Sequence, residues 1–150
     1  MTKSINSKNA LAIVFLTVFI DLLGFGIIIP VLPAFALDLG KSFTQSNTPA
    51  FIAAAIFSFM QFLSAPFWGS KSDQIGRRPV FLISIAISFI GYLIFGVTTS
   101  LWLLLLSRLL AGIGAGNFSA AQAYIADITP PEKRAERYGL IGVAFGLGFI

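Results

Sequence analysis

The feature that most constrains the fold is a short, strongly charged segment between two long apolar stretches. Residues 69–78 have the sequence Gly-Ser-Lys-Ser-Asp-Gln-Ile-Gly-Arg-Arg, and mostly apolar residues fill Pro49–Trp68 before them and Pro79–Val97 after them. Each apolar stretch has about the 20 residues that a helix needs to cross a bilayer core of about 30 Å. The chain must therefore cross a membrane, turn sharply and cross back, which predicts a polytopic membrane protein.

Composition and charge placement agree with this prediction. The chain is 57% hydrophobic and 11% charged, whereas soluble domains carry about 25% charged residues. Most of the basic residues fall in three segments, so the net charge of +4 indicates membrane topology and not a nucleic-acid partner: Lys3 and Lys8; Lys71, Arg77 and Arg78; Lys133, Arg134 and Arg137. The chain has no histidine or cysteine, no phosphate-binding glycine motif between a strand and a helix, and no metal-ligand cluster. We therefore expect neither an enzyme nor a cofactor or metal, and any proton carrier must be a carboxylate.

The apolar segments predict an all-α bundle of transmembrane helices. Four are long enough to span: Ala10–Ala36, Pro49–Trp68, Pro79–Val97 and Leu101–Ile125. A fifth begins near Arg137 and has only about 13 residues, or about 20 Å of helix, so we expect it to be truncated. Because short loops rich in Lys and Arg stay in the cytoplasm, we predict a multi-pass protein of the plasma (inner) membrane. Its N-terminus, residues 69–78 and residues 126–137 would all be cytoplasmic.

Two ionisable residues, Asp21 and Arg108, lie inside apolar segments. A charge facing lipid costs several kcal/mol, so both should face the bundle interior or a water-filled cavity. Asp21 lies about 17 Å from the inner end of its span and Arg108 about 19 Å from that side. We therefore predict that they form an ion pair or share one cavity at mid-membrane, as proton-coupling residues or as a static structural pair.

Polar and small residues recur at helical spacing beside these charges. The polar ones predict a substrate-lining surface: Thr17, Ser58, Gln61, Ser119 and Gln122. Gly112, Gly116 and Ala120 form a separate stripe of small residues, which is typical of a helix–helix contact. The segment Thr129-Pro-Pro-Glu132 has the pattern of a capping box, which predicts a helix start there that leads into the fifth span. Asp127, Glu132 and Lys133 are compatible with either a solvated helix start or a gating role.

Several of these segments together resemble one known family. Residues 69–79 resemble the signature turn between helices 2 and 3 of the major facilitator superfamily, Gly-x-x-x-Asp-x-x-Gly-Arg-Arg/Lys. Asp21-Leu-Leu-Gly-Phe-Gly-Ile-Ile-Ile-Pro-Val-Leu-Pro33 is similar to helix 1 of the twelve-helix drug:proton antiporters, and Leu106-Ser-Arg-Leu-Leu-Ala-Gly-Ile-Gly114 to the helix 4 motif of proton-coupled members. Ala126-Asp-Ile-Thr-Pro130 resembles the following loop. The likeness covers nearly the whole chain and is strongest to the tetracycline-efflux type.

The resemblance implies a fold and residue roles. The chain would be the first five helices of a six-helix N-terminal half, with the C-terminal half of the carrier missing. Five residues would form or permit a cytoplasmic gate: Gly69, Asp73, Gly76, Arg77 and Arg78. Arg108 would couple proton transfer to substrate movement, with Asp21 and Gln61 in the pathway. The expected partners are a small-molecule substrate, protons and the lipid bilayer.

The sequence also departs from the tetracycline carriers. They have an aspartate before the tyrosine of helix 3, where this chain has Gly91 before Tyr92, which argues against tetracycline itself as substrate. The expected function is proton-coupled efflux of amphiphilic small molecules by alternating access. The alternatives are proton-coupled import of a sugar or metabolite on the same fold, a membrane module that assembles with a partner, or an inactive truncated fragment.

Overall fold

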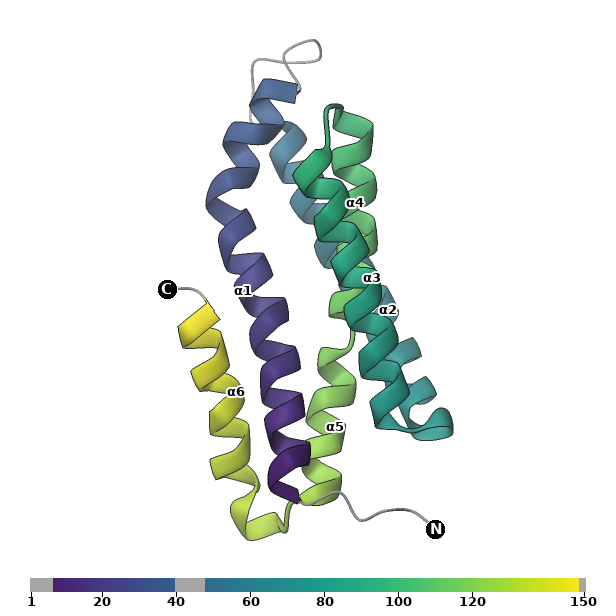
Figure 1. Cartoon of the computed structure of the whole chain (residues 1–150), viewed down its shortest axis with the longest axis vertical. Helices are drawn as coiled ribbons and strands as arrows, with labels where there is room; N and C mark the ends of the chain where they lie inside the picture. The colour runs from purple at the N-terminus through teal and green to yellow at the C-terminus, as the bar shows by residue number, and fades with distance from the viewer. Residues whose placement is uncertain (1–6, 40–47, 149–150) are drawn as a thin grey trace.

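The structure is a computed structural model that describes residues 7–39 and 48–148 (Figure 1). The described residues form helices only, which confirms the predicted all-α class: α1 (Ser7–Leu39), α2 (Thr48–Ile75), α3 (Arg77–Val97), α4 (Leu101–Ala115), α5 (Phe118–Ile128), the short 3₁₀-helix η1 (Pro131–Lys133) and α6 (Arg134–Gly148). Four segments are long and apolar enough to cross a membrane: Val14–Phe35, Thr48–Ile75, Arg77–Val97 and Leu101–Ile128.

The helices run up and down along one long axis. The start of α1, the α2–α3 turn and the α5–η1–α6 connection lie at the lower end in Figure 1, whereas the α3–α4 connection lies at the upper end. Two of the three basic segments, residues 71–78 and 133–137, therefore lie at the same end of the bundle as the start of α1. Lys3 of the N-terminal segment lies outside the described residues. That this end faces the cytoplasm stays a prediction.

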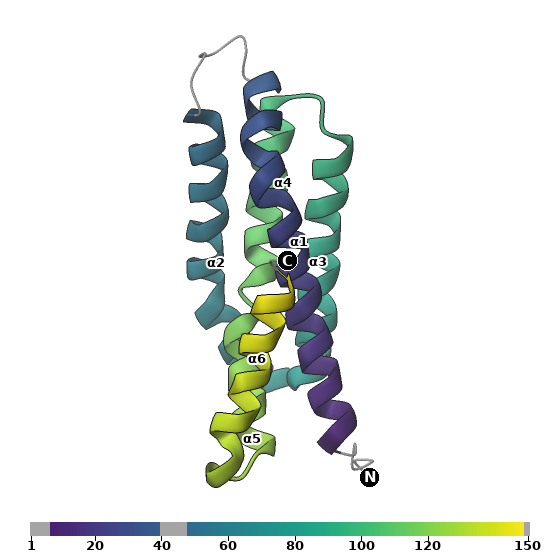
Figure 2. The same ribbon diagram turned by 90° about the vertical axis from the view of Figure 1, so that its left-hand side faces the viewer.

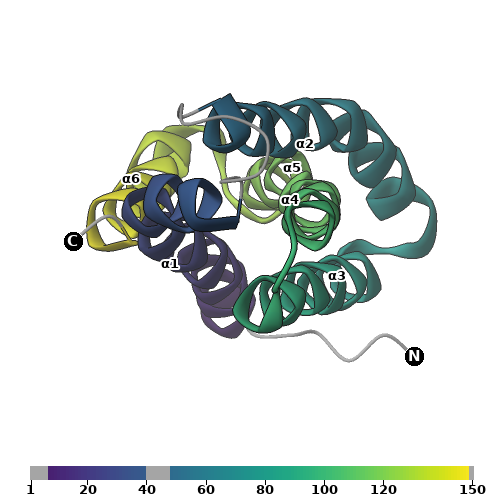
Figure 3. The same ribbon diagram turned by 90° about the horizontal axis from the view of Figure 1, so that it is seen from above.

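Helix α4 occupies the middle of the bundle. Seen from above, it lies between α2 and α3, and α1 and α6 lie side by side next to them (Figure 3). Val14 and Val18 of α1 pack with Ile141 and Ala144 of α6 in one buried cluster, and α6 runs along the lower part of α1 (Figure 2). Bulky apolar side chains cover the outside; Phe62, for example, is 78% exposed. Such a surface suits a hydrocarbon environment.

Glycines set the distance between α4 and its neighbours. A Cβ added to Gly112 would meet Phe57 and Met60 of α2, and one added to Gly116 would meet Ser64 and Trp68 of the same helix. The predicted small-residue contact face is therefore confirmed at Gly112 and Gly116, with α2 as its partner.

The signature turn is tighter than its sequence suggests. Helix α2 continues through Ser70, Lys71 and Asp73 to Ile75, and α3 begins at Arg77. Gly76 alone separates them, with φ at 94°, a backbone conformation that residues with a side chain rarely adopt. The expectation that Gly69 also permits the turn is wrong, because Gly69 lies within α2 and the positive φ among the described glycines belongs to Gly76.

The predicted capping box is also not formed. The helical turn begins at Pro131, its N-cap is Pro130, and no side chain caps it. The hydroxyl of Thr129 is buried without a hydrogen-bond partner. Pro130 adds one residue between the expected cap and the first helical residue, which moves the Thr129 side chain out of capping position. Arg134 instead donates to the Thr129 carbonyl oxygen at 3.2 Å.

Candidate transport and proton-coupling site

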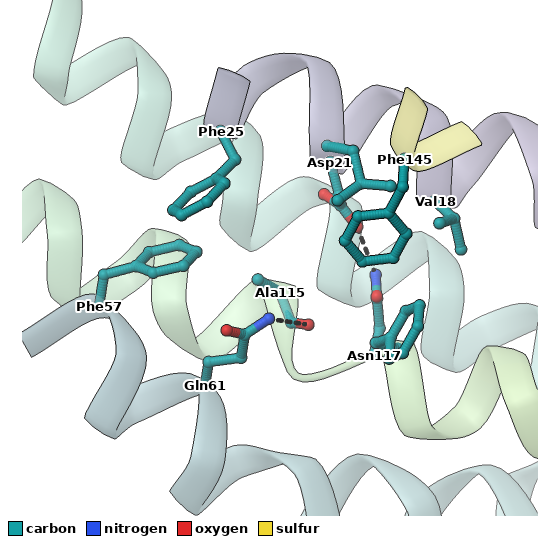
Figure 4. A pocket seen from close by; sticks show the side chains of 10 residues that line it. Val18, Asp21, Phe25, Phe57, Gln61, Ala115, Asn117 and Phe145 are labelled. Atoms are coloured by element: carbon teal, nitrogen blue, oxygen red, sulfur yellow. Dashed lines mark hydrogen bonds between the residues drawn. The ribbon is translucent and has the colours of Figure 1, made fainter. Parts of the chain in front are cut away.

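A cavity of about 200 Å³ lies between α1, α2, the α4–α5 junction and α6 (Figure 4). Its wall is mostly aromatic and aliphatic, with three polar side chains. The lining residues are Val18, Asp21, Leu22, Phe25, Phe57, Gln61, Ala115, Asn117, Phe118 and Phe145. The phenyl rings of Phe25 and Phe57 stack with their centroids 5.1 Å apart. The cavity can thus receive an apolar group while presenting a few polar atoms to it.

Asp21 reaches this cavity from α1 and is held by an amide. The Asn117 side chain donates from Nδ2 to Oδ2 of Asp21 at 2.9 Å, and the same nitrogen lies 2.9 Å from Oγ of Ser84 on α3. Figure 4 shows the Asp21–Asn117 bond at the cavity wall. The predicted intramembrane carboxylate therefore faces the bundle interior, and a neutral donor binds it.

Arg108 does not form the expected ion pair with Asp21. No ion pair joins the two residues in the part of the chain that the structure describes, and Arg108 is not among the cavity-lining residues. The Arg108 guanidinium carbon lies 4.6 Å from the ring centroid of Phe95 and 5.7 Å from that of Tyr92. Arg108 is only 2% exposed, and its Nη2 has no hydrogen-bond partner. The physical reason is the direction of the side chain around the axis of α4. Arg108 points toward α3, where aromatic rings stabilise the cation by cation–π contact.

Tyr92 is the residue that contacts both charged residues. Its hydroxyl donates to the backbone oxygen of Asp21 at 3.4 Å, while its ring faces Arg108. Tyr92 also meets Gly24 of α1 so closely that a Cβ there would lie 2.7 Å from the ring. Asp21 and Arg108 are thus neighbours through an aromatic side chain and share no direct bond.

The predicted lining residues divide into two groups. Gln61 lines the cavity and donates to the Ala115 carbonyl oxygen at 3.4 Å. The other four lie outside this cavity: Thr17 is buried, Ser58 and Gln122 are exposed, and Ser119 donates to the Ala65 carbonyl oxygen at 2.8 Å. A contact of these four with substrate stays a prediction.

Sequence reasoning missed Asn117 and the phenyl rings of the cavity. Phenylalanines are too frequent in this chain, at 16 of 150 residues, for their positions to indicate a site. Asn117 did carry a signal, because a buried amide in an apolar span requires a partner. Its place directly after Gly114-Ala115-Gly116 also marks a possible helix break.

The residues of the predicted cytoplasmic gate gather at the lower end of the bundle. Arg77 lies 2.7 Å from a carboxylate oxygen of Asp73 and 2.7 Å from one of Asp127. It also donates to the hydroxyl of Ser72. Asp127, for which the sequence left two roles open, therefore joins this cluster and links the α2–α3 turn to the end of α5. Arg78 is exposed, and its role stays a prediction.

Comparison with known proteins identifies the family. Residues 14–150 match the Major Facilitator Superfamily. The chain belongs to this family. Its members are membrane transporters and not enzymes, which confirms the expected protein class, and the described residues contain no group of three or more potential metal ligands.

Individual relatives give the same result. The chain is 41% identical over 144 residues to the class C tetracycline resistance protein of Escherichia coli, covering 96% of this chain and 36% of that protein. It is 35% identical over 152 residues to multidrug resistance protein 2 of Bacillus subtilis (strain 168), covering 100% of this chain and 37% of that protein. The crystal structure of the human organic anion transporter MFSD10 (TETRAN) matches with a TM-score of 0.81 and 32% identity, covering 97% of this chain and 40% of that one. The chain thus spans little more than a third of its sequence relatives, and the predicted likeness to tetracycline-efflux proteins is confirmed.

Proposed function

We propose that this chain forms the N-terminal part of a secondary transporter that exports amphiphilic small molecules in exchange for protons by alternating access. The observation that carries this proposal is the Asp21 carboxylate in an otherwise largely apolar cavity. A carboxylate can bind and release a proton within the membrane, and such residues mark proton pathways in transporters. In a full-length carrier, the C-terminal half would close the pathway around this cavity.

The cavity wall supports an amphiphilic substrate. The rings of Phe25, Phe57, Phe118 and Phe145 offer apolar contact to one part of such a molecule. Gln61, Asn117 and Asp21 offer hydrogen-bonding atoms to another part. Because a substrate and a proton would both act at Asp21, binding of one would favour release of the other, which is the exchange that an antiporter requires.

The charge cluster at the lower end supports a gate. Arg77 links Asp73 in the last turns of α2 to Asp127 at the end of α5. Breaking and forming these contacts would let the α2–α3 turn and the end of α5 separate and approach each other during the transport cycle. Export, not import, is favoured by the relatives named as resistance proteins.

The test compares Asp21→Asn with the parent in the full-length carrier. Asp38→Asn is the matched control, since Asp38 is an exposed carboxylate near the end of the same helix. We expect the parent to lower accumulation of a fluorescent amphiphile in cells, an uncoupler to abolish this, and Asp21→Asn to reduce it at least tenfold while Asp38→Asn does not.

Three results would contradict the proposal. Full export by Asp21→Asn would remove Asp21 from the coupling mechanism. Uptake of one nutrient without any effect on amphiphile accumulation would indicate an importer. Absence of both activities, together with co-purification of a stable partner protein, would indicate a non-transporting membrane module.

A further inference from the structure

The fourth span is interrupted at Gly116 and Asn117, between the end of α4 and the start of α5. Helix α4 ends at Ala115, and the backbone N–H groups of Gly116 and Asn117 both point to the Gly114 carbonyl. In a continuous α-helix these two groups would bond to the carbonyls of Gly112 and Ile113. The interruption therefore frees two carbonyl groups inside the membrane, where each needs another donor.

Helix α2 supplies donors for the freed carbonyls. Ser64 Oγ lies 3.5 Å from the Gly112 carbonyl oxygen, and Trp68 Nε1 donates to the Ile113 carbonyl oxygen at 2.6 Å. The interruption is thus a stable feature of the fold, held by side chains of a neighbouring helix. A short tightened turn of this kind inside a long helix often marks a hinge.

Asn117 connects this interruption to Asp21. Its backbone forms the turn between α4 and α5, and its side chain is 2% exposed. The amide nitrogen has two hydrogens, which is enough for one bond to Asp21 and one to Ser84. Ser84 in turn donates to the Phe81 carbonyl oxygen at 3.0 Å. Both N–H groups of the Asn117 amide are therefore engaged in hydrogen bonds while the Asp21 carboxylate is charged.

We propose that Asn117 is a positioning residue that links protonation of Asp21 to the shape of the interruption in the fourth span. This inference rests on the proposed proton-coupled function of Asp21. A proton that binds to Oδ2 of Asp21 turns this acceptor into an O–H donor. Two donors, the O–H of Asp21 and the Nδ2–H of Asn117, would then face each other. The amide must then rotate to present its oxygen, and the bond from Nδ2 to Ser84 breaks.

Other groups that face Asp21 do not provide this link. From α3, Tyr92 donates to the backbone oxygen of Asp21, and from α4, Arg108 lies against the ring of Tyr92. Gln61 of α2 and Phe145 of α6, which share the cavity, carry no charge. Ser88 of α3 also lies near the Asp21 side chain but not at the turn. Among these groups, Asn117 both donates to the carboxylate and lies at the turn between α4 and α5.

Trp68 provides a reporter for the test. It is 5% exposed, its indole N–H bonds to the freed Ile113 carbonyl, and a Cβ on Gly116 would lie 3.0 Å from its ring. The purified full-length carrier is reconstituted with every other tryptophan, including Trp102, replaced by phenylalanine. The fluorescence spectrum is then recorded between pH 5 and pH 9, without substrate and without a proton gradient.

We expect the emission maximum to change with pH in the parent and this change to be lost in Asp21→Asn. It should also be lost in Asn117→Ala and in Asn117→Leu, which is close to asparagine in shape, because neither side chain has a hydrogen-bond donor or a titratable group. Ser64→Ala is the matched control, because Ser64 contacts the interruption from α2 and does not contact Asp21. It should keep the pH response.

Two outcomes would overturn the inference. One is a parent spectrum that does not depend on pH or a response that survives in Asp21→Asn. The other is an unchanged response in Asn117→Leu, which nearly preserves shape and so tests the amide donors if Asn117→Ala does not fold. Since the measurement needs no transport, its failure is distinct from failure of the proposed efflux function, which is measured by accumulation in cells.

Discussion

Gly91 on α3 is the position at which the resemblance to the tetracycline carriers implies an aspartate, and the structure indicates what a side chain there would meet. A Cβ on Gly91 would lie 2.7 Å from the backbone nitrogen of Ala111 and 3.0 Å from the carbonyl oxygen of Ser107, whereas ordinary contact begins at 3.4 Å. Both atoms belong to the backbone of α4, which cannot rotate away as a side chain can. We therefore predict that Gly91→Ala forces α3 and α4 apart.

The expected cost follows from two terms. Overpacking a well-packed contact costs about 1–3 kcal/mol of unfolding free energy, whereas alanine in a helix is favoured over glycine by about 0.5–1 kcal/mol. Gly96→Ala on the same helix isolates the second term, because a Cβ at Gly96 would meet nothing within 4 Å. The difference between the two variants should therefore equal the packing cost, about 1–3 kcal/mol.

The assay is reversible unfolding of the reconstituted carrier in mixed micelles, followed by circular dichroism as the denaturing detergent is increased. Gly91→Ala should unfold earlier than the parent and Gly96→Ala should not. Gly91→Asp should be at least as unstable as Gly91→Ala, because it adds a larger and charged group at the same contact. Equal stability of Gly91→Ala and Gly96→Ala, within about 0.5 kcal/mol, would refute the argument that helix contact excludes the aspartate.

Three further predictions concern the turn, the interruption and the gate. Gly76→Ala should destabilise by about 1–3 kcal/mol because φ is 94° there, whereas Gly69→Ala, inside α2, should be neutral in the same unfolding assay. Trp68→Phe should cost about 1–3 kcal/mol by leaving a freed carbonyl of the fourth span without its donor. Asp127→Asn should lower transport strongly but stability by less than about 1 kcal/mol, because its partner Arg77 is reached at an exposed site; a double-mutant cycle with Arg77→Gln measures the stability term.

The sequence predicts the helices well because length and hydropathy are enough to define a membrane span. Three of the four expected spans agree with single helices, and the differences occur where local chemistry decides. Ser70 to Ile75 extend α2 beyond its apolar part, since polar residues can continue a helix outside a hydrocarbon core. The interruption before Asn117 was not predicted, because glycine and alanine leave the apolar pattern of the span unbroken.

The candidate site was predicted only in part, and the reason is geometric. Counting residues along a span gives the depth of a side chain, and it placed Asp21 and Arg108 at similar depth. Helical spacing separately predicted that Gln61 lines a cavity, and the structure brings Gln61 and Asp21 to the same one. Depth does not give the direction around the helix axis. Arg108 points toward the rings of Phe95 and Tyr92, so equal depth did not produce the expected pair.

Neutral partners at both charges suit the proposed function, in which the Asp21 carboxylate changes its protonation state during transport. If Asp21 and Arg108 formed a direct buried ion pair, each protonation would leave an unpaired cation, at a cost of about 3–5 kcal/mol. A hydrogen bond from the Asn117 amide to a charged group is worth about 1.5–3 kcal/mol. Losing this bond on protonation of Asp21 therefore costs less than breaking a buried ion pair. The cation–π contact of Arg108 with Phe95 does not involve Asp21. The arrangement therefore lets one group titrate without leaving the other uncompensated, which a direct ion pair would not allow.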